Sequence, residues 1–518
     1  MSPAQTTSNT AEPVVDETVW HWLDEARAAA EQSSCAELLD LGGIRVFDAL
    51  VSPLYVTVLN ALRQGPSQPQ PLARQAVARL RAVAYDWKTE LRRRQAAVPG
   101  APLSETQVVL WSCDVTHTAV QLPVMRALCE HGVDCRMLTC RYKVAFDLRD
   151  RDEDVLYTVA AWPEATRGAR REGVRRGKAM ARAASWELPD LHSRRGGELE
   201  ELVRSTIRRH LPQVTESVVN ARAVLEHAQP SVIVAGNDLT IEGRVACRVA
   251  AAGGVPTAVI QHGAITGDSL QARHCADRML LFGDIHRRQL AARGVSEERL
   301  VVCGAPHLDS RPRQMGRPDA QLQEQLGLRP GERWVLVATS GPGHRISMPH
   351  HEVVVANVAR LSQALPDVPI VIKLHRKDQV EHYAQALKDC ASARYWVIAD
   401  GTAGYPRQIY SWLQGCSVLL TGASTTAQEA MLLNVPVITM DFNDEIHGVD
   451  FIDAGATLHV RSGEELVSGV RAMLEAGGPP AETQRRIDAL LKESFHALDG
   501  RAAQRCAAAV GDLAGLEH

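Results

Sequence analysis

The segment from Thr421 to Ala430, TGASTTAQEA, has residue types and spacing suited to binding a phosphate group. It follows an apolar run that ends at Leu420, and a segment of helical spacing comes after it. The first N–H groups of a helix have no intrahelical partner, and the helix dipole places partial positive charge there. The hydroxyl side chains at the expected helix start are Ser424, Thr425 and Thr426. We predict a nucleotide-diphosphate site here, with Glu429 one turn later accepting hydrogen bonds from a ribose diol.

Other groups that could bind an anion follow two further predicted strands in the C-terminal half of the chain. Gly341 and Gly343 would let the backbone approach a ligand closely, because glycine has no Cβ. Positive or N–H-bearing side chains could stabilise the charge of a leaving phosphate without a metal. The candidates are His344, Arg345, Lys373 and His375. The glycine spacing is not that of a P-loop, which excludes ATPases of that class.

Two residues in the first half are candidates for a general base. His262, in Gln261-His262-Gly263, directly follows a predicted strand, and an imidazole titrates near neutral pH. The alternatives for His262 are a turn cap and a phosphate ligand. Asp238 also follows a strand and is the rival base, with capping of the next helix as its alternative. We expect an acceptor to bind on this side, near Asp114, Asn237, Arg244, Gln261 and Gly263.

These candidates are positioned by apolar segments that alternate with helical segments from residue 107 onward. Strands separated by single helices predict parallel sheets with both faces covered, and such sheets bind ligands beyond the carboxyl ends of their strands. We therefore predict an α/β protein with two Rossmann-like domains that face a cleft. The expected ranges are a disordered tail at 1–17, a helical N-terminal region at 18–104, a first domain at 105–309 with a basic helical insertion at about 145–225, a second domain at 320–480 and closing helices at 481–518.

Two segments lie outside the strand–helix alternation, and the sequence leaves their roles open. The helical N-terminal region could pack on the body, bind a partner, contact a membrane surface or form a homodimer. The arginine-rich stretch 167–182 could bind a phosphorylated or acidic acceptor, or it could be a solvated helical face.

Composition excludes several functional classes. The net charge of −4 does not favour nucleic acid or an anionic membrane, and the 4% aromatic content argues against a single-strand stacking surface. We find no run of 18 apolar residues, so we predict no transmembrane helix. The polar, acidic start does not resemble a secretory signal.

The cysteine pattern indicates the compartment and argues against a metal. Eleven dispersed cysteines without a C-x-x-C motif are typical of reduced thiols, and we expect a cytoplasmic protein, with peripheral membrane contact left open. We predict no metal site and no bound cofactor. The D-x-D pattern at Asp150, Asp152 and Asp154 is discounted, because no apolar strand precedes it.

Four strings resemble a known group of enzymes: Pro256 to Gly263, Cys303 to Asp309, Ile372 to His375 and Thr421 to Ile438. They resemble bacterial capsule and teichoic-acid-type glycosyltransferases of the GT-B fold, including CDP-glycerol glycerophosphotransferases and sialyltransferases. The last string also resembles the hydrolysing UDP-N-acetylglucosamine 2-epimerases.

The resemblance, which covers roughly residues 105–515, implies roles for individual residues. His262 would be the base or an acceptor-side residue, His375 and Ser424 to Thr426 would contact donor phosphates, and Glu429 would hold the ribose. The chain departs from these families at Arg376, where the His-Pro motif has proline, and at Gly422, where an aspartate is usual.

We therefore expect transfer of a sugar, or a glycerophosphate-like group, from a nucleotide-activated donor to a hydroxyl acceptor without a metal. The acceptor would be a glycan, a lipid-linked group or a small molecule. Two alternatives stay open: a nucleotide-sugar 2-epimerase on the same fold, and a non-catalytic GT-B-like binding protein.

Overall fold

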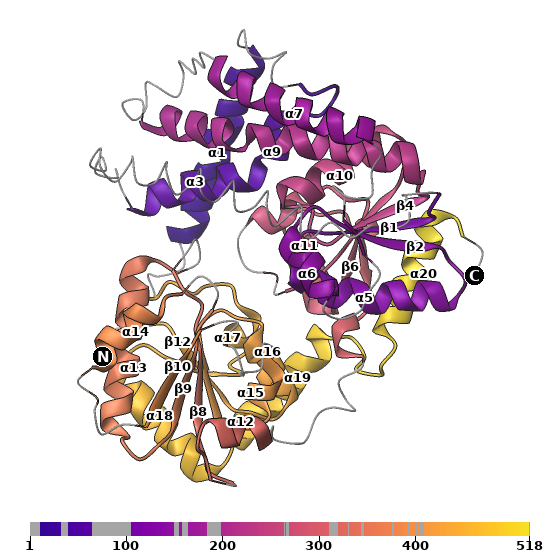
Figure 1. Cartoon of the computed structure of the whole chain (residues 1–518). Helices are drawn as coiled ribbons and strands as arrows, with labels where there is room; N and C mark the ends of the chain where they lie inside the picture. The colour runs from indigo at the N-terminus through magenta and orange to yellow at the C-terminus, as the bar shows by residue number, and fades with distance from the viewer. Residues whose placement is uncertain are drawn as a thin grey trace.

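The structure is a computed structural model of the whole chain, and it is shown as a ribbon in Figure 1. The residues that it describes are 11–32, 40–64, 105–149, 155–157, 164–183, 198–263, 265, 269–309, 320–329, 331–342, 346–375, 378–388, 390, 394–399, 402 and 409–516.

The first of two sheets has seven parallel strands in the order β3-β2-β1-β4-β5-β6-β7. Its middle strand is buried along its whole length, as expected for a strand with helices on both faces. The strands are β1 (Val108–Ser112), β2 (Cys135–Thr139), β3 (Val155–Tyr157), β4 (Val232–Ala235), β5 (Thr257–Ile260), β6 (Arg278–Leu281) and β7 (Leu300–Val302).

The second sheet has six parallel strands in the order β10-β9-β8-β11-β12-β13. The strands are β8 (Val335–Ala338), β9 (Ile370–Lys373), β10 (Tyr395–Ile398), β11 (Val418–Thr421), β12 (Val437–Met440) and β13 (Leu458–Val460). Two parallel sheets in separate units confirm the predicted α/β, two-domain fold. Strands β3 and β13 were not predicted, because β3 follows a densely charged run and β13 has a histidine between its two apolar residues.

Helices cover both faces of the first sheet, and a helical layer lies on one side of it (Figure 1). The layer consists of α1 (Ala11–Gln32), α2 (Val46–Ala49), α3 (Val51–Gln64), α7 (Glu164–Ala183) and α9 (Glu198–Ala228). The other elements of this unit are α5 (Val115–Glu130), α6 (Tyr142–Arg149), α10 (Ile241–Ala252), η2 (Ser269–Arg273), α11 (Asp284–Ala292), η3 (Glu297–Arg299) and η4 (Pro306–Leu308).

The helical layer differs in one respect from its prediction. Helix α1 begins at Ala11, within the range expected to be a disordered tail, because its buried residues Val19, Leu23 and Ala26 anchor one face of a longer helix. The arginine-rich helix α7 has the solvated face that was one of its two alternatives, with Arg167, Arg171, Arg175, Arg176 and Arg182 exposed. Arg170 of this helix is buried and pairs with Glu216 at 2.6 Å. The Asp150–Asp154 run and residues 65–104 lie outside the described residues.

The second unit has its own helices on both faces. They are α12 (Ala320–Gln325), α13 (Met348–Ala364), α14 (Val380–Leu387), α15 (Ile409–Leu413), α16 (Thr426–Leu432), α17 (Asp450–Asp453), α18 (Gly463–Ala476) and α19 (Ala481–Ser494). Within the described residues, no helix is long and apolar enough to cross a membrane.

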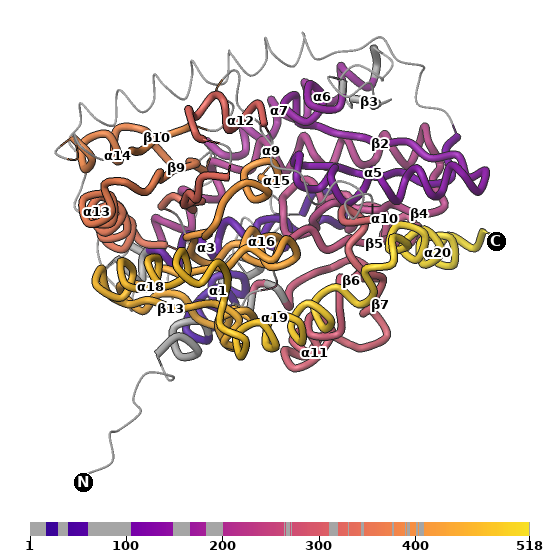
Figure 2. The backbone as a smooth tube through the Cα atoms, turned by 90° about the horizontal axis from the view of Figure 1, so that it is seen from below, coloured from indigo at the N-terminus to yellow at the C-terminus, as the bar shows by residue number. Residues whose placement is uncertain are grey.

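The last helix, α20 (Ala502–Ala514), returns to the first unit and packs against α5. Figure 2 shows the C-terminal part of the chain running from α19 to α20, away from the second unit. The Asp309 carboxylate accepts hydrogen bonds from the N–H groups of Ala502 and Ala503 at 3.0 and 2.6 Å. The end of the first unit is therefore tied directly to the start of the returning helix.

Candidate functional site

A cavity of about 730 Å³ lies between the two sheets. Its floor is formed by the carboxyl ends of β4 and β5, and helices α3 and α9 contribute residues from the helical layer. From the second unit, Ala423, Ser424 and Thr425 complete the wall. The cavity thus joins the two polar sheet edges that the sequence identified.

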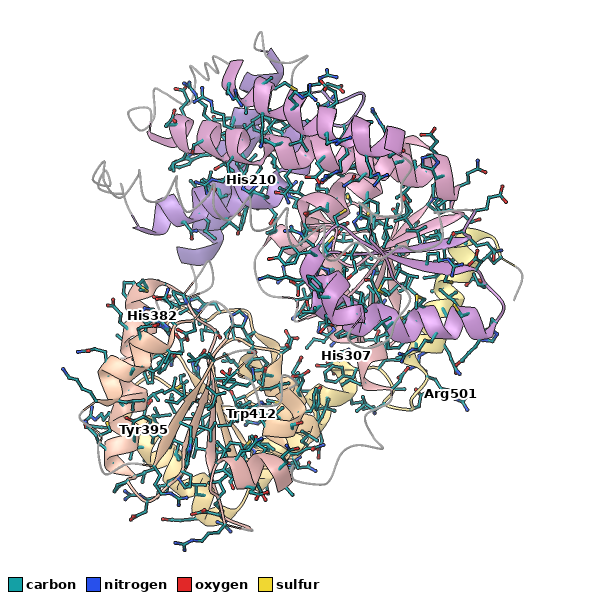
Figure 3. The ribbon with its side chains drawn as sticks, viewed as in Figure 1. His210, His307, His382, Tyr395, Trp412 and Arg501 are labelled. Atoms are coloured by element: carbon teal, nitrogen blue, oxygen red, sulfur yellow. The ribbon has the colours of Figure 1, made fainter. Side chains whose placement is uncertain are left out.

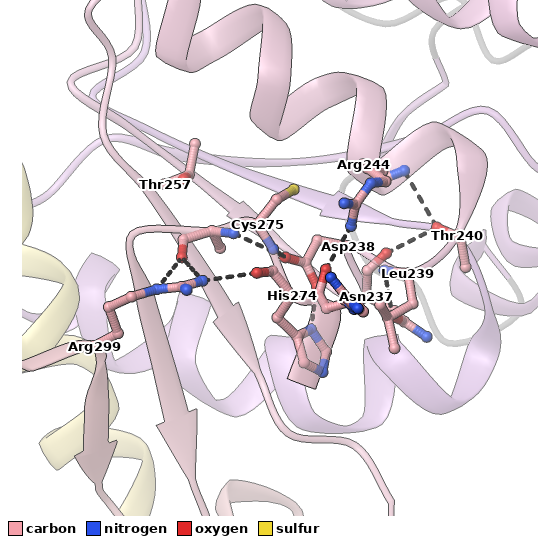
Figure 4. Close-up of polar contacts among 12 residues, drawn as sticks. Asn237, Asp238, Leu239, Thr240, Arg244, Thr257, His274, Cys275 and Arg299 are labelled. Carbon is pink, nitrogen blue, oxygen red and sulfur yellow. Dashed lines mark hydrogen bonds and ion pairs between the residues drawn. The ribbon is translucent and has the colours of Figure 1, made fainter. Parts of the chain in front are cut away.

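Asp238 and His274 form a buried pair at this cavity. The Asp238 carboxylate interacts with Nδ1 of His274, and it also accepts hydrogen bonds from the backbone N–H groups of Cys275 and Ala276 (Figure 4). Burial alone would raise the pKa of Asp238, but the positive charge of His274, when that ring is protonated, and its hydrogen bond hold the pKa well below its usual range. Asp238 is therefore an ionised group that orients His274, and Nε2 of His274 is the nitrogen left for a ligand.

His262 lies on the same wall, beyond the end of β5. Its ring packs edge-on against that of buried His117, with 4.4 Å between the ring centroids. Burial and the nearby His274 lower the pKa of His262 to about 4. The imidazole is consequently neutral near pH 7 and can accept a proton or a hydrogen bond.

The neighbours of His262 shape the turn and bring the two units together. Gln261 donates to the Gly263 carbonyl at 2.9 Å and accepts from the N–H of Phe282 at 2.8 Å, so its amide is used within the turn. A Cβ placed on Gly263 would lie 4.0 Å from Cγ2 of Thr425. The turn after β5 therefore faces the turn before α16 in the second unit.

The turn before α16 contains Ser424 and Thr425, and the helix begins at Thr426. Ser424 Oγ bonds to Thr426 Oγ1 at 3.1 Å and accepts from the N–H of Thr426 at 3.3 Å. Ser424 and Thr425 line the cavity. Glu429 accepts a hydrogen bond from the Tyr410 hydroxyl at 2.8 Å.

Other residues predicted for the phosphate side lie elsewhere. Of the described residues, Gly341, Lys373, His375 and Glu429 are not in the cavity lining. The backbone N–H of His375 donates to Thr339 Oγ1 at 2.9 Å, which fixes the loop after β9. Gly343, His344 and Arg345 lie outside the described residues.

On the first unit, Asn237 lines the cavity, whereas Asp114 and Arg244 have structural contacts. The Asp114 carboxylate caps helix α5 by accepting from the N–H of Thr116 at 3.2 Å. Arg244 is buried and donates to Asp48 of helix α2 at 2.7 Å. Arg244 therefore anchors the helical layer to the sheet.

Several cavity residues were missed by the sequence prediction. His274 follows Asp238 by 36 residues and lies in a stretch without strand or helix periodicity. Arg141 and Glu242 form an ion pair at 2.7 Å, and the buried Glu242 also accepts from Gln213 at 2.9 Å. A single histidine or ion pair between distant segments has no local signal.

A comparison with known protein families distinguishes between the transferase prediction and the epimerase alternative. The family model described as UDP-N-acetylglucosamine 2-epimerase matches residues 200–511, which include both walls of the cavity. The chain belongs to this epimerase family. No curated protein matches the sequence.

Solved structures agree with the family at the level of fold. S. aureus MnaA, solved with UDP, aligns with a TM-score of 0.54 at 13% identity, covering 79% of this chain and 98% of that chain. A Listeria monocytogenes protein assigned as UDP-N-acetylglucosamine 2-epimerase aligns with a TM-score of 0.53 at 15% identity, covering 79% and 96%.

Membership of the epimerase family overturns the predicted glycosyltransferase activity. The resemblance to CDP-glycerol glycerophosphotransferases and sialyltransferases is likewise not supported, whereas a GT-B-like nucleotide-sugar fold is. The reason is chemical: a turn that binds a nucleotide diphosphate serves transfer and epimerisation equally, so it could not discriminate between them. The family match favours the alternative, which is epimerisation on the same fold.

Proposed function

We propose that this protein is a nucleotide-sugar 2-epimerase that acts on a UDP-linked N-acetylated sugar in the cavity between its two sheets. The observation that carries the proposal is the family match, which spans the two strand-end turns and the helix start that line this cavity. MnaA, which shares the fold, was solved with UDP.

Epimerisation at C2 needs proton transfer and no acceptor. Carbon 2 is not adjacent to a carbonyl, so the electron pair left when its proton is removed would form a C1–C2 double bond and expel UDP from carbon 1. Return of a proton to the opposite face of carbon 2 and of UDP to carbon 1 gives the epimer, so the sugar keeps its composition and the reaction needs no co-reactant. The enzyme must hold groups that accept and donate a proton close to that carbon.

The described cavity offers two imidazoles for this purpose. Asp238 fixes the tautomer of His274 and stabilises the imidazolium that forms when Nε2 accepts a proton. His262, neutral near pH 7, is the second proton-transfer group. Ser424 and Thr425, which line the facing wall, would hold the diphosphate.

Proton NMR of UDP-N-acetylglucosamine incubated with the full chain in D2O tests the proposal. We expect a second UDP-sugar that differs at C2, and deuterium at C2 in both sugars. His274→Gln should abolish the exchange, whereas His131→Ala, at an exposed position after α5, should leave it intact. An unchanged sugar pool without deuterium would refute the epimerase, and nucleotide-dependent thermal stabilisation in that sample would favour the non-catalytic binding protein.

A further inference from the structure

A second cluster of histidines and an aspartate lies in the other unit, outside the cavity. His351 lies in the first turn of α13, Asp378 just before α14, and His382 in the first turn of α14. Figure 3 labels His382 at the end of the second unit that faces the helical layer. One atom from each residue points into a common space.

The three atoms form a nearly equilateral triangle. His351 Nε2 is 3.2 Å from His382 Nδ1 and 3.3 Å from Asp378 Oδ1, and His382 Nδ1 is 3.6 Å from the same oxygen. Ligands about 2.0–2.1 Å from a tetrahedral Zn²⁺ are roughly 3.3 Å apart. The triangle therefore has the dimensions of three corners of a zinc coordination tetrahedron.

Hydrogen bonds alone do not explain this triangle. The ionised carboxylate oxygen carries no proton, and each ring nitrogen carries at most one. If both nitrogens are protonated, two N–H groups face each other across 3.2 Å. If one ring nitrogen is unprotonated, it can accept a hydrogen bond from the other ring, but its lone pair also faces the lone pair of the Asp378 oxygen. Every arrangement leaves one unfavourable contact, and a cation bound by all three atoms removes it.

The surroundings of the triangle are those of a supported site. The side chains of His351 and Asp378 are 4% and 0% exposed, and that of His382 is 29% exposed, so the space opens to solvent on the His382 side. Asp378 is oriented by the Gln379 N–H, which donates to Oδ1 at 2.9 Å, and by the Tyr383 hydroxyl, which donates to Oδ2 at 3.2 Å. Such outer contacts fix metal-binding carboxylates.

The types of the three side chains also suit a metal. Two imidazoles and one carboxylate form a typical ligand set for zinc, with a fourth position left for water or a ligand group.

We propose that His351, Asp378 and His382 bind one Zn²⁺ ion, which joins the starts of α13 and α14 beside the carboxyl edge of the second sheet. The site is independent of the epimerase proposal, and it differs from our sequence-based expectation of no metal. That expectation relied on cysteine spacing and an aspartate motif, whereas these ligands are 27 and 31 residues from His351 and share no motif.

Titration of the tag-free, chelator-treated full chain with Zn²⁺, in competition with a chromophoric chelator, tests the site. We expect one tight equivalent per chain. His382→Ala and Asp378→Asn should weaken binding by about 100-fold or more, and Tyr383→Phe, which removes only an outer contact, by about 10-fold. His131→Ala, which removes an exposed histidine from the first unit, is the matched control and should bind like the wild type.

Co²⁺ gives a second readout that does not depend on the variants folding. The wild type with one equivalent of Co²⁺ should show the intense visible bands of tetrahedral coordination, without the strong near-ultraviolet band of a cobalt–thiolate bond. Absence of a tight Zn²⁺ equivalent in the wild type would overturn the proposal. So would equal affinity in the wild type and Asp378→Asn, or a thiolate band that assigns the metal to cysteines.

Discussion

The two units both place histidine beside a buried aspartate, but the two carboxylates have different neighbours. Asp238, in the first unit, is surrounded by donors: one imidazole and two backbone N–H groups. Asp378, in the second, accepts from the Gln379 N–H and the Tyr383 hydroxyl, and it also faces two imidazole nitrogens that face each other. Asp238 thus contacts one imidazole and Asp378 contacts two. The number of imidazole nitrogens beside the aspartate is the difference between the proposed proton-transfer pair and the proposed zinc site.

The largest expected effect is that of Asp238→Asn. The asparagine amide would donate to Nδ1 of His274 and move the ring proton to Nε2, where it blocks proton acceptance. We expect epimerisation to fall by roughly 100- to 1000-fold, measured by NMR as the initial rate of C2 deuteration. The free energy of unfolding should fall by about 1–3 kcal/mol, since the hydrogen bonds from the Cys275 and Ala276 N–H groups would go to a neutral amide oxygen in place of a charged carboxylate. An Asp238→Asn rate within threefold of wild type would remove the pair from the mechanism.

The first unit should also be sensitive to acid. His262, with a folded pKa of about 4, and His286, with one of about 3 because of burial, both titrate near 6.5 in the unfolded chain. Between pH 6.5 and 4 the unfolded chain takes up protons that the folded chain does not, so stability is lost as the pH falls. We expect a loss of roughly 1–2 kcal/mol per histidine between pH 7 and 5.

Urea unfolding at a series of pH values measures this loss. His286→Gln removes one of the two groups without touching the cavity, so it should lower the slope of stability against pH below 6.5. An unchanged slope in this variant would show that burial of His286 does not drive the effect.

The strand-end glycines provide a matched pair across the two units. A Cβ on Gly236, after β4, would lie 2.6 Å from Cβ of buried His117, which has no room to move. A Cβ on Gly422, after β11, would have its nearest neighbour, Ile446 Cδ1, at 3.5 Å. Gly236→Ala should cost about 1–3 kcal/mol of unfolding free energy, and Gly422→Ala close to none. Equal thermal shifts for the two would contradict this comparison.

The smallest effect is expected at the interface of the two units. Thr425→Val keeps the size of the side chain that faces Gly263 and removes only its hydroxyl. Loss of one hydrogen bond to a phosphate should raise the KM for the UDP-sugar by about 3- to 10-fold, with little change in kcat. A fall in kcat at constant KM would instead place Thr425 near the reacting carbon.

The sequence was sufficient for the features that depend on local pattern. Buried strands such as β1 could be predicted because they are apolar runs in the sequence. Four cavity residues were identified because they follow such runs: Asp238, His262, Ser424 and Thr425. The contact of His274 with Asp238 depends on a loop without helix or strand periodicity, so the sequence pattern could not predict it. The reaction class could not be predicted from the turn before α16, since such a turn would suit a diphosphate in a transferase and in an epimerase alike.

Asp309 and α20 have a mechanical consequence. The chain leaves the first unit after Asp309 and returns to it at Ala502, and these two points are hydrogen-bonded to each other. Both crossings therefore start from a single anchored point on the first unit. A rotation of the second unit about this point would change the separation of Gly263 and Thr425, and hence the width of the cavity, while both sheets stay intact.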